Sequence, residues 1–287
     1  MTKRNIFPFL LVFISFAFHP QLFANEQCCD KNTKEDYFIQ PFYLEPITDS
    51  VIGSTSLALA SSALMCDKVF HIKENNTQDF APFPLDQNKV NAFDKPFIRP
   101  YNKTLDYVGD GVLALAFALP SVMFSSSNTD WLTIGTMYAE TLLLAYGVKQ
   151  WGKLLITRPR PYMYFTDYPV NEVNEGDWHC SMPSGHTTME FSAAAFTSAV
   201  FNAYFPDSFW RHIVTASSFG LATTVGIIRM CSGNHFATDV LAGAAIGTIC
   251  GFIVPFFHST TFRNMVGLNK NTDISVTPLG INVKIKI

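Results

Sequence analysis

The sequence predicts an all-α fold, an antiparallel bundle of about five or six apolar helices embedded in a membrane. The 287 residues are 48% hydrophobic and only 15% charged, which is richer in apolar side chains than an average soluble domain. The apolar residues gather in charge-free runs about as long as bilayer-spanning helices, for which roughly 17–25 residues are needed. Phenylalanine accounts for 27 of the 287 residues, a bias that suits lipid contact or a helical core. This composition excludes a disordered chain, collagen and a coiled coil.

Charge argues against a nucleic-acid partner. The formal net charge is −3, and the sequence contains no cluster of lysine and arginine residues. A protein that binds nucleic acid through its phosphates needs such a cluster. We therefore expect no nucleic acid among the partners.

Residues 1–24 have the pattern of a signal peptide. Lys3 and Arg4 precede an apolar run from residue 6 to residue 18, and a cleavage site is predicted after Ala24. Leu22 is larger than the residue usually found three places before the cut, so an uncleaved N-terminal anchor stays open as the alternative. Either interpretation exports the chain that follows.

The rest of the chain divides into three parts. Residues 25–100 form a partly helical N-terminal region, residues 101–260 a helical-bundle domain, and residues 261–287 a tail. Alternation of Ile281, Val283 and Ile285 with polar residues predicts a strand in that tail. The charge-free runs that predict helices are residues 50–66, 111–129, 131–147, 191–206, 213–228 and 240–262, of which 131–147 is broken by Glu140. The first of them is rich in serine and alanine, which favours a segment lying flat or packing outside the bilayer.

Three glycines share one face of the last predicted helix. Gly243, Gly247 and Gly251 follow one another at a spacing of four residues. A face without side chains lets a neighbouring backbone approach closely, as in membrane helix pairs. A tightly packed pair of helices in a soluble protein is the alternative.

A first polar motif lies where the third charge-free run ends. Lys153 and Arg160 are separated by six residues, and Pro159 and Pro161 predict that the helix ends near Thr157. Two cations held near the C-terminal end of a helix could together bind an anion. An interfacial anchor, or a favourable partner for the helix C-terminus, is the alternative.

A second motif, Pro183-Ser184-Gly185-His186, precedes another apolar helix. Its proline and glycine turn backbone N–H groups at the start of the helix toward one point, where an anion is favoured. Ser184 adds a hydroxyl donor and His186 a titratable proton. The alternative is an N-cap beside an unrelated histidine.

The third motif contains Arg229, His235 and Asp239. A carboxylate four residues after a histidine can lie on the same helix face and hold one ring nitrogen, which leaves the other nitrogen free to attack. This is the arrangement of nucleophilic catalysis by histidine. A structural hydrogen bond between the two side chains is the alternative.

Together the three motifs resemble the superfamily of type 2 phosphatidic acid phosphatases, bacterial class A acid phosphatases and vanadium haloperoxidases. The family pattern is Lys-x6-Arg-Pro, Pro-Ser-Gly-His and Ser-Arg-x5-His-x3-Asp, and this chain matches it in order and spacing between about residues 101 and 257. The departure is Ile228, which stands where the family usually has serine. One hydrogen bond near the site is lost with that serine, but no charged or nucleophilic group.

The resemblance implies a role for each residue of the motifs. His235 would be the nucleophile on phosphorus, Asp239 would orient it, and His186 would protonate the leaving alcohol and then activate water. The phosphate-binding residues implied are Lys153, Arg160, Ser184, Gly185 and Arg229. The resemblance implies neither a metal ion nor another cofactor, since cationic side chains take the place of magnesium.

The implied function is hydrolysis of phosphate monoesters or pyrophosphates, with a phosphorylated lipid and the membrane as partners. Phosphatidate, phosphatidylglycerophosphate and a polyprenyl pyrophosphate are the candidate substrates. An acid phosphatase for soluble esters, a vanadium haloperoxidase and a non-catalytic membrane scaffold stay open as alternatives. If residues 50–66 do not cross the bilayer, two crossings precede Lys153, and the site of this inner-membrane protein faces the periplasm. The aromatic and acidic loop between the first two motifs is expected to border the entrance.

A disulfide between Cys180 and Cys231 is also expected. The two cysteines flank the second and third motifs, which would surround one phosphate. Export to an oxidising compartment makes the bond chemically possible. Two unrelated buried thiols are the alternative.

Overall fold

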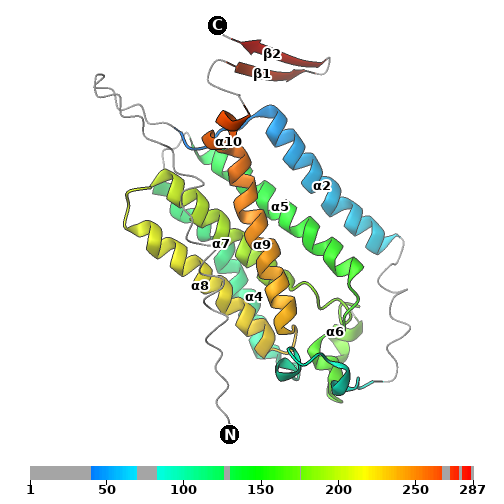
Figure 1. Cartoon of the computed structure of the whole chain (residues 1–287). Helices are drawn as coiled ribbons and strands as arrows, with labels where there is room; N and C mark the ends of the chain where they lie inside the picture. The colour runs from blue at the N-terminus through cyan, green and yellow to red at the C-terminus, as the bar shows by residue number, and fades with distance from the viewer. Residues whose placement is uncertain are drawn as a thin grey trace.

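Six long helices form an antiparallel bundle in the part of the chain that the structure describes, which confirms the all-α fold (Figure 1). The structure, a computed structural model, describes residues 40–69, 83–125, 130–174, 176–266, 272–277 and 280–285. The predicted signal peptide, Cys28 and Cys29 lie outside the described residues. The long helices are α2 (Pro46–Lys68), α4 (Lys103–Phe117), α5 (Trp131–Leu155), α7 (Gly185–Tyr204), α8 (Trp210–Cys231) and α9 (Ala237–His258).

Shorter elements connect these helices and close the two ends of the bundle. They are the 3-10 helices Gln87–Lys89, Lys95–Phe97, Leu119–Ser125 and Pro161–Tyr164, the helices α6 (Val170–Asn174) and α10 (Thr260–Met265), and the strands β1 (Thr272–Thr277) and β2 (Gly280–Ile285). The two strands pair antiparallel, with Val276 opposite Ile281. The strand predicted in the tail is thus present as the second arm of a hairpin.

Helix α7 occupies the centre of the bundle. It packs against α4, α5, α8 and α9, and its residues from Phe191 to Phe201 are all buried. Alanine, serine and threonine make up much of this stretch, so the surrounding helices can approach its backbone. Phe196 and Val200 pack with Met137 of α5 and Val254 of α9 in the main apolar core. The second motif, at the start of α7, is therefore anchored to the most buried element.

The glycine face of α9 packs against the backbone of α7, as the four-residue spacing predicts. A Cβ atom added to Gly247 would lie 2.2 Å from the carbonyl oxygen of Thr188. A Cβ atom added to Gly243 would lie 2.6 Å from the carbonyl oxygen of Ser184, just before α7, and one added to Gly251 would lie 2.5 Å from that of Ser192 in α7. No side chain, not even a methyl group, fits between the two helices at these positions.

We expect Gly247→Ala to destabilise the protein, because the new methyl group must push α9 away from α7. Overpacking of this kind costs about 1–3 kcal/mol, which thermal unfolding of the purified protein would detect as a lower Tm. The matched control is Gly220→Ala in α8, where an added Cβ meets nothing within 4 Å. Alanine favours a helix by about 1 kcal/mol over glycine, so the control should leave Tm unchanged or raise it. A Tm for Gly247→Ala equal to that of the control would contradict the packing described here.

The outer surface of the bundle is apolar. Three helical segments in the described residues are long and apolar enough to cross a membrane by length and composition: Lys103–Met123, Trp210–Cys231 and Ala237–His258. Large apolar side chains on these segments face outward, among them Leu115, Ile213 and Ile249. Such a surface suits contact with lipid tails.

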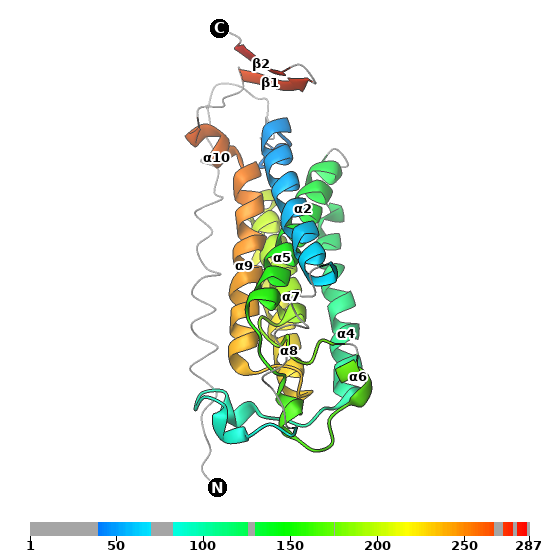
Figure 2. The ribbon, with the colours of Figure 1, turned by 90° about the vertical axis from the view of Figure 1, so that its right-hand side faces the viewer.

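Helix α2 lies lengthwise on α5 (Figure 2). The indole Nε1 of Trp151 donates a hydrogen bond of 3.1 Å to the carbonyl oxygen of Leu59, and Gly147 lies directly against the backbone of α2 at Ala60. Residues 50–66 thus belong to the bundle, and among the described residues α2 is not one of the segments apolar enough to cross a membrane. The expectation that they lie flat or pack outside the bilayer stays a prediction. Their small side chains, which lowered their hydropathy, are what allows this close packing along the bundle.

Candidate active site

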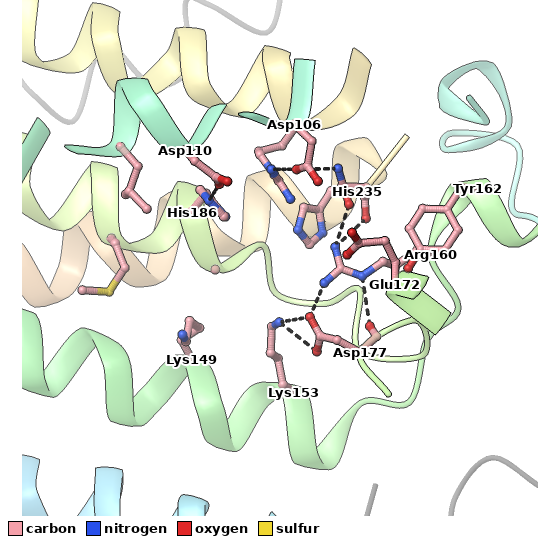
Figure 3. Close-up of a pocket in the computed structure, with 15 residues that line it drawn as sticks. Asp106, Asp110, Lys149, Lys153, Arg160, Tyr162, Glu172, Asp177, His186 and His235 are labelled. Atoms are coloured by element: carbon pink, nitrogen blue, oxygen red, sulfur yellow. Dashed lines mark hydrogen bonds and ion pairs between the residues drawn. The ribbon is translucent and has the colours of Figure 1, made fainter. Parts of the chain in front are cut away.

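The three motifs meet in one pocket of about 340 Å³ at one end of the bundle (Figure 3). Its lining includes six of the eight site residues predicted from the sequence: Lys153, Arg160, Gly185, His186, Arg229 and His235. The remaining lining residues are Asp106, Asp110, Leu113, Lys149, Tyr162, Glu172, Asp177, Met189 and Asn234. Residues far apart in the sequence are thus brought to one surface with both basic and acidic groups.

Helix ends position the lining residues. Lys153 lies in the last turn of α5, which ends at Leu155, two residues before the predicted end. Gly185 and His186 are the first residues of α7, and Arg229 lies in the last turn of α8. His235 lies in the turn between α8 and α9. That turn is possible because Gly233 has a φ of +77°, a conformation that favours glycine.

Each predicted phosphate-binding cation and the histidine of the second motif face a carboxylate. The pairs are Lys153–Asp177 at 3.2 Å, Arg160–Asp177, Arg229–Asp106 and His186–Asp110 at 2.7 Å. Two of these carboxylates come from α4 and one from the loop after α6, and the sequence motifs contain none of them. A phosphate that enters the pocket must compete with these carboxylates for the same donors.

His235 is buried, with only 1% of its surface exposed, and lies at the inner wall of the pocket. Its Nδ1 atom lies 3.5 Å from Ser181 Oγ and 3.8 Å from Asp239 Oδ2. Burial lowers the pKa of His235 well below its usual value, and the nearby cations Arg160, Arg229 and Lys153 lower it further. The ring is therefore neutral near pH 7, as a nucleophile must be.

Asp239 lies behind His235, fully buried and held from three sides. Its Oδ2 atom accepts hydrogen bonds from Ser181 Oγ at 2.5 Å and from the backbone N–H of Phe236 at 2.8 Å. Its Oδ1 atom accepts one from Arg158 at 2.5 Å. These three donors fix the carboxylate beside the ring of His235, whose Nδ1 it can hold.

Arg158 is the important residue that sequence reasoning missed. Its guanidinium binds Asp239 on one side and Asp94 on the other, the latter at 2.7 Å, and lies over the ring of Phe236. Asp94 belongs to the loop before α4 and also accepts hydrogen bonds from Thr238. The arginine thus ties the first motif, the third motif and a distant loop together. Its position two residues before Arg160, between the motif residues, was the available signal.

Ser184 does not line the pocket. It is fully buried at the N-cap of α7, where its Oγ lies 2.9 Å from Thr187 Oγ1 and its backbone N–H donates to the carbonyl oxygen of Asp239. In this arrangement its hydroxyl contacts the first turn of α7, and its backbone N–H joins the start of α7 to α9. The second motif offers the pocket Gly185 and His186.

The expected disulfide between Cys180 and Cys231 is wrong, since the two residues are not bonded to each other. Cys180 is buried and forms a backbone bridge with Arg158, whereas Cys231 is exposed at the end of α8. The second and third motifs do meet, but they meet through His235 and Ser181.

Comparison with known proteins places the motifs in a family. Residues 135–263, which contain all three motifs, match the PAP2 superfamily. The match covers 129 of the 287 residues and shows the likeness of this part of the chain to the PAP2 superfamily. The matched residues include most of α5, the helices α7, α8 and α9, and every residue predicted for the site.

Two curated relatives and one solved structure are similar to parts of this chain. A lipid A 1-phosphatase of Porphyromonas gingivalis is 32% identical over 51% of this chain and 28% of its own length. The bacitracin transport permease protein BcrC of Bacillus licheniformis is 32% identical over 43% of this chain and 59% of its own length. This chain therefore spans less than two thirds of each relative.

The solved structure is a transmembrane PAP2 type phosphatidylglycerolphosphate phosphatase from Bacillus subtilis. It is 21% identical, covers 73% of this chain and 95% of its own, and has a TM-score of 0.40.

The carboxylate of Asp177 should weaken anion binding in this pocket, because it occupies donors of Lys153 and Arg160. We expect Asp177→Asn to bind orthovanadate about two to five times more tightly, as loss of a partly exposed ion pair suggests. Isothermal titration of the purified protein would measure this. Asp167→Asn, an exposed acidic residue of the same loop, is the matched control and should bind vanadate like the wild type. Weaker binding by Asp177→Asn would contradict the competition.

Proposed function

We propose that the chain is a metal-independent phosphatase that hydrolyses phosphate monoesters or pyrophosphates of lipids through a phosphohistidine intermediate. The observation that carries this proposal is the convergence of Lys153, Arg160, Arg229, His186 and His235 on one pocket. Three cations can hold the three non-bridging oxygens of a phosphoryl group, and two histidines can serve as nucleophile and acid. The match of residues 135–263 to the PAP2 superfamily supports the same assignment.

The proposed reaction has two steps. In the first, the neutral ring of His235 attacks phosphorus, the bond to the leaving oxygen breaks, and His186 gives its proton to that oxygen. In the second, His186 takes a proton from water, which attacks the phosphohistidine and releases inorganic phosphate and free His235. Burial and the charge of Arg229 lower the pKa of His186 to about 4. Asp110, 2.7 Å from His186 Nε2, opposes this shift and favours the protonated ring that the first step needs.

Transition-state charge would be held by fixed groups. Negative charge spreads over the equatorial oxygens of the transferring phosphoryl group. Lys153, Arg160 and Arg229 reach the pocket from three elements, and the backbone N–H of Gly185 at the start of α7 adds a donor. Asp239, held by Arg158, would keep His235 oriented and would balance the positive charge that the ring gains.

A lipid substrate is proposed on two grounds. Segments of three helices are apolar and long enough to cross a membrane, so the pocket at their end can receive a headgroup from the bilayer. The curated relatives include a lipid A 1-phosphatase and a lipid A 4'-phosphatase of the same organism. Phosphatidate, phosphatidylglycerophosphate, a polyprenyl pyrophosphate and lipid A are therefore the substrates to compare.

The decisive experiment is phosphate release without magnesium from these four lipids and from a small soluble ester. We expect the wild-type protein in detergent to show a kcat/KM at least about tenfold higher for one lipid, and His186→Ala to lose about 10²–10⁴-fold. A preference for the soluble ester would contradict the lipid part and favour an acid phosphatase. Vanadate-dependent oxidation of halide would identify a haloperoxidase. No phosphate release, with no thermal stabilisation by vanadate, would indicate a non-catalytic scaffold.

We further propose that the protein lies in the inner membrane with the pocket facing the periplasm. Helix α2 begins at the end of the bundle opposite the pocket, because its Asp49 contacts His258, the last residue of α9. A periplasmic pocket therefore places residues 40–45 on the cytoplasmic side. An export signal at residues 1–24 would place them in the periplasm, so the two expectations conflict for a bundle that crosses the membrane.

Cysteine labelling distinguishes the two arrangements. Cys231 is exposed at the pocket end, and Ser208→Cys would mark the opposite end, in the connection between α7 and α8. With a periplasmic pocket, a membrane-impermeant maleimide should label Cys231 in intact cells, and Cys231→Ser should abolish that signal. Labelling of Ser208→Cys instead, with Cys231 reacting only after lysis, would place the pocket in the cytoplasm and support export of the N-terminal region.

A further inference from the structure

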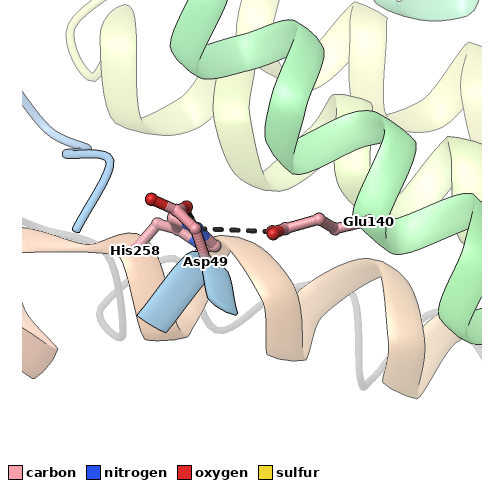
Figure 4. Close-up of side chains that lie close together, drawn as sticks. All are labelled: Asp49, Glu140 and His258. Atoms are coloured by element: carbon pink, nitrogen blue, oxygen red, sulfur yellow. Dashed lines mark hydrogen bonds and ion pairs between the residues drawn. The ribbon is translucent and has the colours of Figure 1, made fainter. Parts of the chain in front are cut away.

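Three ionisable side chains gather at the end of the bundle far from the phosphate pocket (Figure 4). They are Asp49 in the first turn of α2, Glu140 in α5 and His258 at the end of α9. His258 Nε2 lies 2.8 Å from Asp49 Oδ1 and 3.3 Å from Glu140 Oε2. Helix α9 separates His258 from the pocket, and its 22 residues correspond to about 33 Å.

The hydrogen bonds of His258 fix the position of its proton. Its Nδ1 atom lies 2.9 Å from the carbonyl oxygen of Val254, which can only accept, so Nδ1 carries a proton. In the neutral ring, Nε2 then presents a lone pair to two carboxylate oxygens. Three acceptors that converge in this way need either a metal cation among them or a second proton on the ring. Metal-binding histidines commonly donate their other ring N–H to a backbone carbonyl, as His258 does.

Glu140 is the second observation that points to a ligand. Its side chain is 91% buried, since only 9% is exposed, and its Oε2 atom has no hydrogen-bond partner. That atom is directed toward the point between Asp49 and His258 (Figure 4). A buried carboxylate oxygen without a donor is costly, and its orientation toward two other ligand atoms means that one cation would satisfy all three.

We propose that Asp49, Glu140 and His258 bind one divalent cation of the Zn²⁺ or Mn²⁺ class. Two carboxylates and one neutral imidazole carry two negative charges, which a divalent cation balances. In a tetrahedral site with bonds near 2.1 Å, ligand atoms lie about 3.4 Å apart, and the three atoms here lie within 4.8 Å of one another. Imidazole favours the later transition metals over magnesium or calcium, whose ligands are mainly oxygen.

The proposed site would have a structural role. Its ligands come from three helices, so the cation would fasten the start of α2 to α5 and α9. Asp49 is 25% exposed, which provides access for the ion and room for water as a further ligand. Nothing in the proposed phosphatase reaction passes through this site, because His235 and the pocket lie at the opposite end of α9.

The test measures metal binding and thermal stability of the full chain in detergent. The protein is stripped with chelator, loaded with one equivalent of Zn²⁺ or Mn²⁺ and dialysed, and bound metal is determined by elemental analysis. We expect about one ion for each wild-type chain and a higher Tm after loading. Asp49→Asn and Glu140→Gln keep the size of the side chain, and each should bind at least about tenfold more weakly and lose the Tm increase.

Two matched variants show where the ion binds. Glu45→Gln removes a nearby carboxylate that pairs with Arg263, and His235→Ala removes the histidine of the phosphate pocket. Both should bind the metal like the wild type. The proposal is overturned if neither metal binds the wild type, or if Asp49→Asn and Glu140→Gln retain full binding and the same Tm increase. In the first case a proton on His258 Nε2 would hold the cluster together. Co-elution with the wild type in gel filtration shows that a variant is folded, and Asp49→Asn alone decides if Glu140→Gln does not fold.

Discussion

Replacing His235 by alanine should reduce kcat for phosphate release by at least about 10³-fold, as expected when the nucleophile of a covalent mechanism is removed. The site offers no substitute, because His186 is paired with Asp110 and the other side-chain nitrogens of the pocket belong to cations or to the amide of Asn234, which is not a nucleophile. Vanadate binding should largely persist, since Lys153, Arg160 and Arg229 remain. Loss of turnover with retained vanadate binding would separate a catalytic role from a structural one.

A matched histidine and a pH profile complete this test. His212→Ala, an exposed position on α8, should keep wild-type activity. Because the pKa of His235 lies well below its usual value, acidification from pH 7 to pH 6 should leave the nucleophile neutral. Activity that survives in His235→Ala at more than a tenth of the wild-type rate would exclude the phosphohistidine mechanism.

Replacing Arg158 by methionine should have the largest effect on stability. The change leaves two fully buried carboxylates, Asp94 and Asp239, without their shared cation. Removing one partner of a buried ion pair costs about 3–5 kcal/mol, because the remaining charge stays desolvated. We expect a clearly lower Tm, together with a lower kcat, since Asp239 is no longer fixed beside His235.

Rescue distinguishes this explanation from a simple loss of packing. Adding Asp94→Asn to Arg158→Met removes one of the two uncompensated charges and should restore part of the lost Tm. Arg99→Met, at an exposed arginine, should change the free energy of unfolding by no more than about 0.5 kcal/mol. Its Tm should therefore stay close to that of the wild type. A double variant less stable than Arg158→Met would show that the unpaired charge is not the cause.

The sequence predicted the helices and the motif residues because both leave local signals. Charge-free runs located the six long helices, and the spacing of Gly243, Gly247 and Gly251 located the contact between α9 and α7. Fixed spacings within short motifs likewise identified His186 and His235. Signals of this kind depend on residues close together in the chain.

The carboxylates around the pocket could not be predicted in the same way. Asp94 and Asp106 lie in a loop and a helix far from the motifs, and each reaches its arginine only through the tertiary fold. The packing of α2 along α5 could not be predicted from hydropathy, because hydropathy measures affinity for lipid, whereas small residues such as Ala60 serve close packing against another helix. The disulfide expected between Cys180 and Cys231 is absent because two loops can meet at one site without bringing their cysteines together.

The balance of charges in the pocket bears on how a substrate arrives. Among the described residues that line it, four are basic and four are acidic, so with both histidines neutral the lining carries no net charge, and the proton on His186 adds a single positive charge. A pocket without net charge creates little long-range field, and electrostatic steering from solution is then weak. We therefore expect association rates that change little with ionic strength. A phosphorylated headgroup would reach the pocket mainly by diffusion of its lipid within the plane of the bilayer, and the cations would act only once it is in contact.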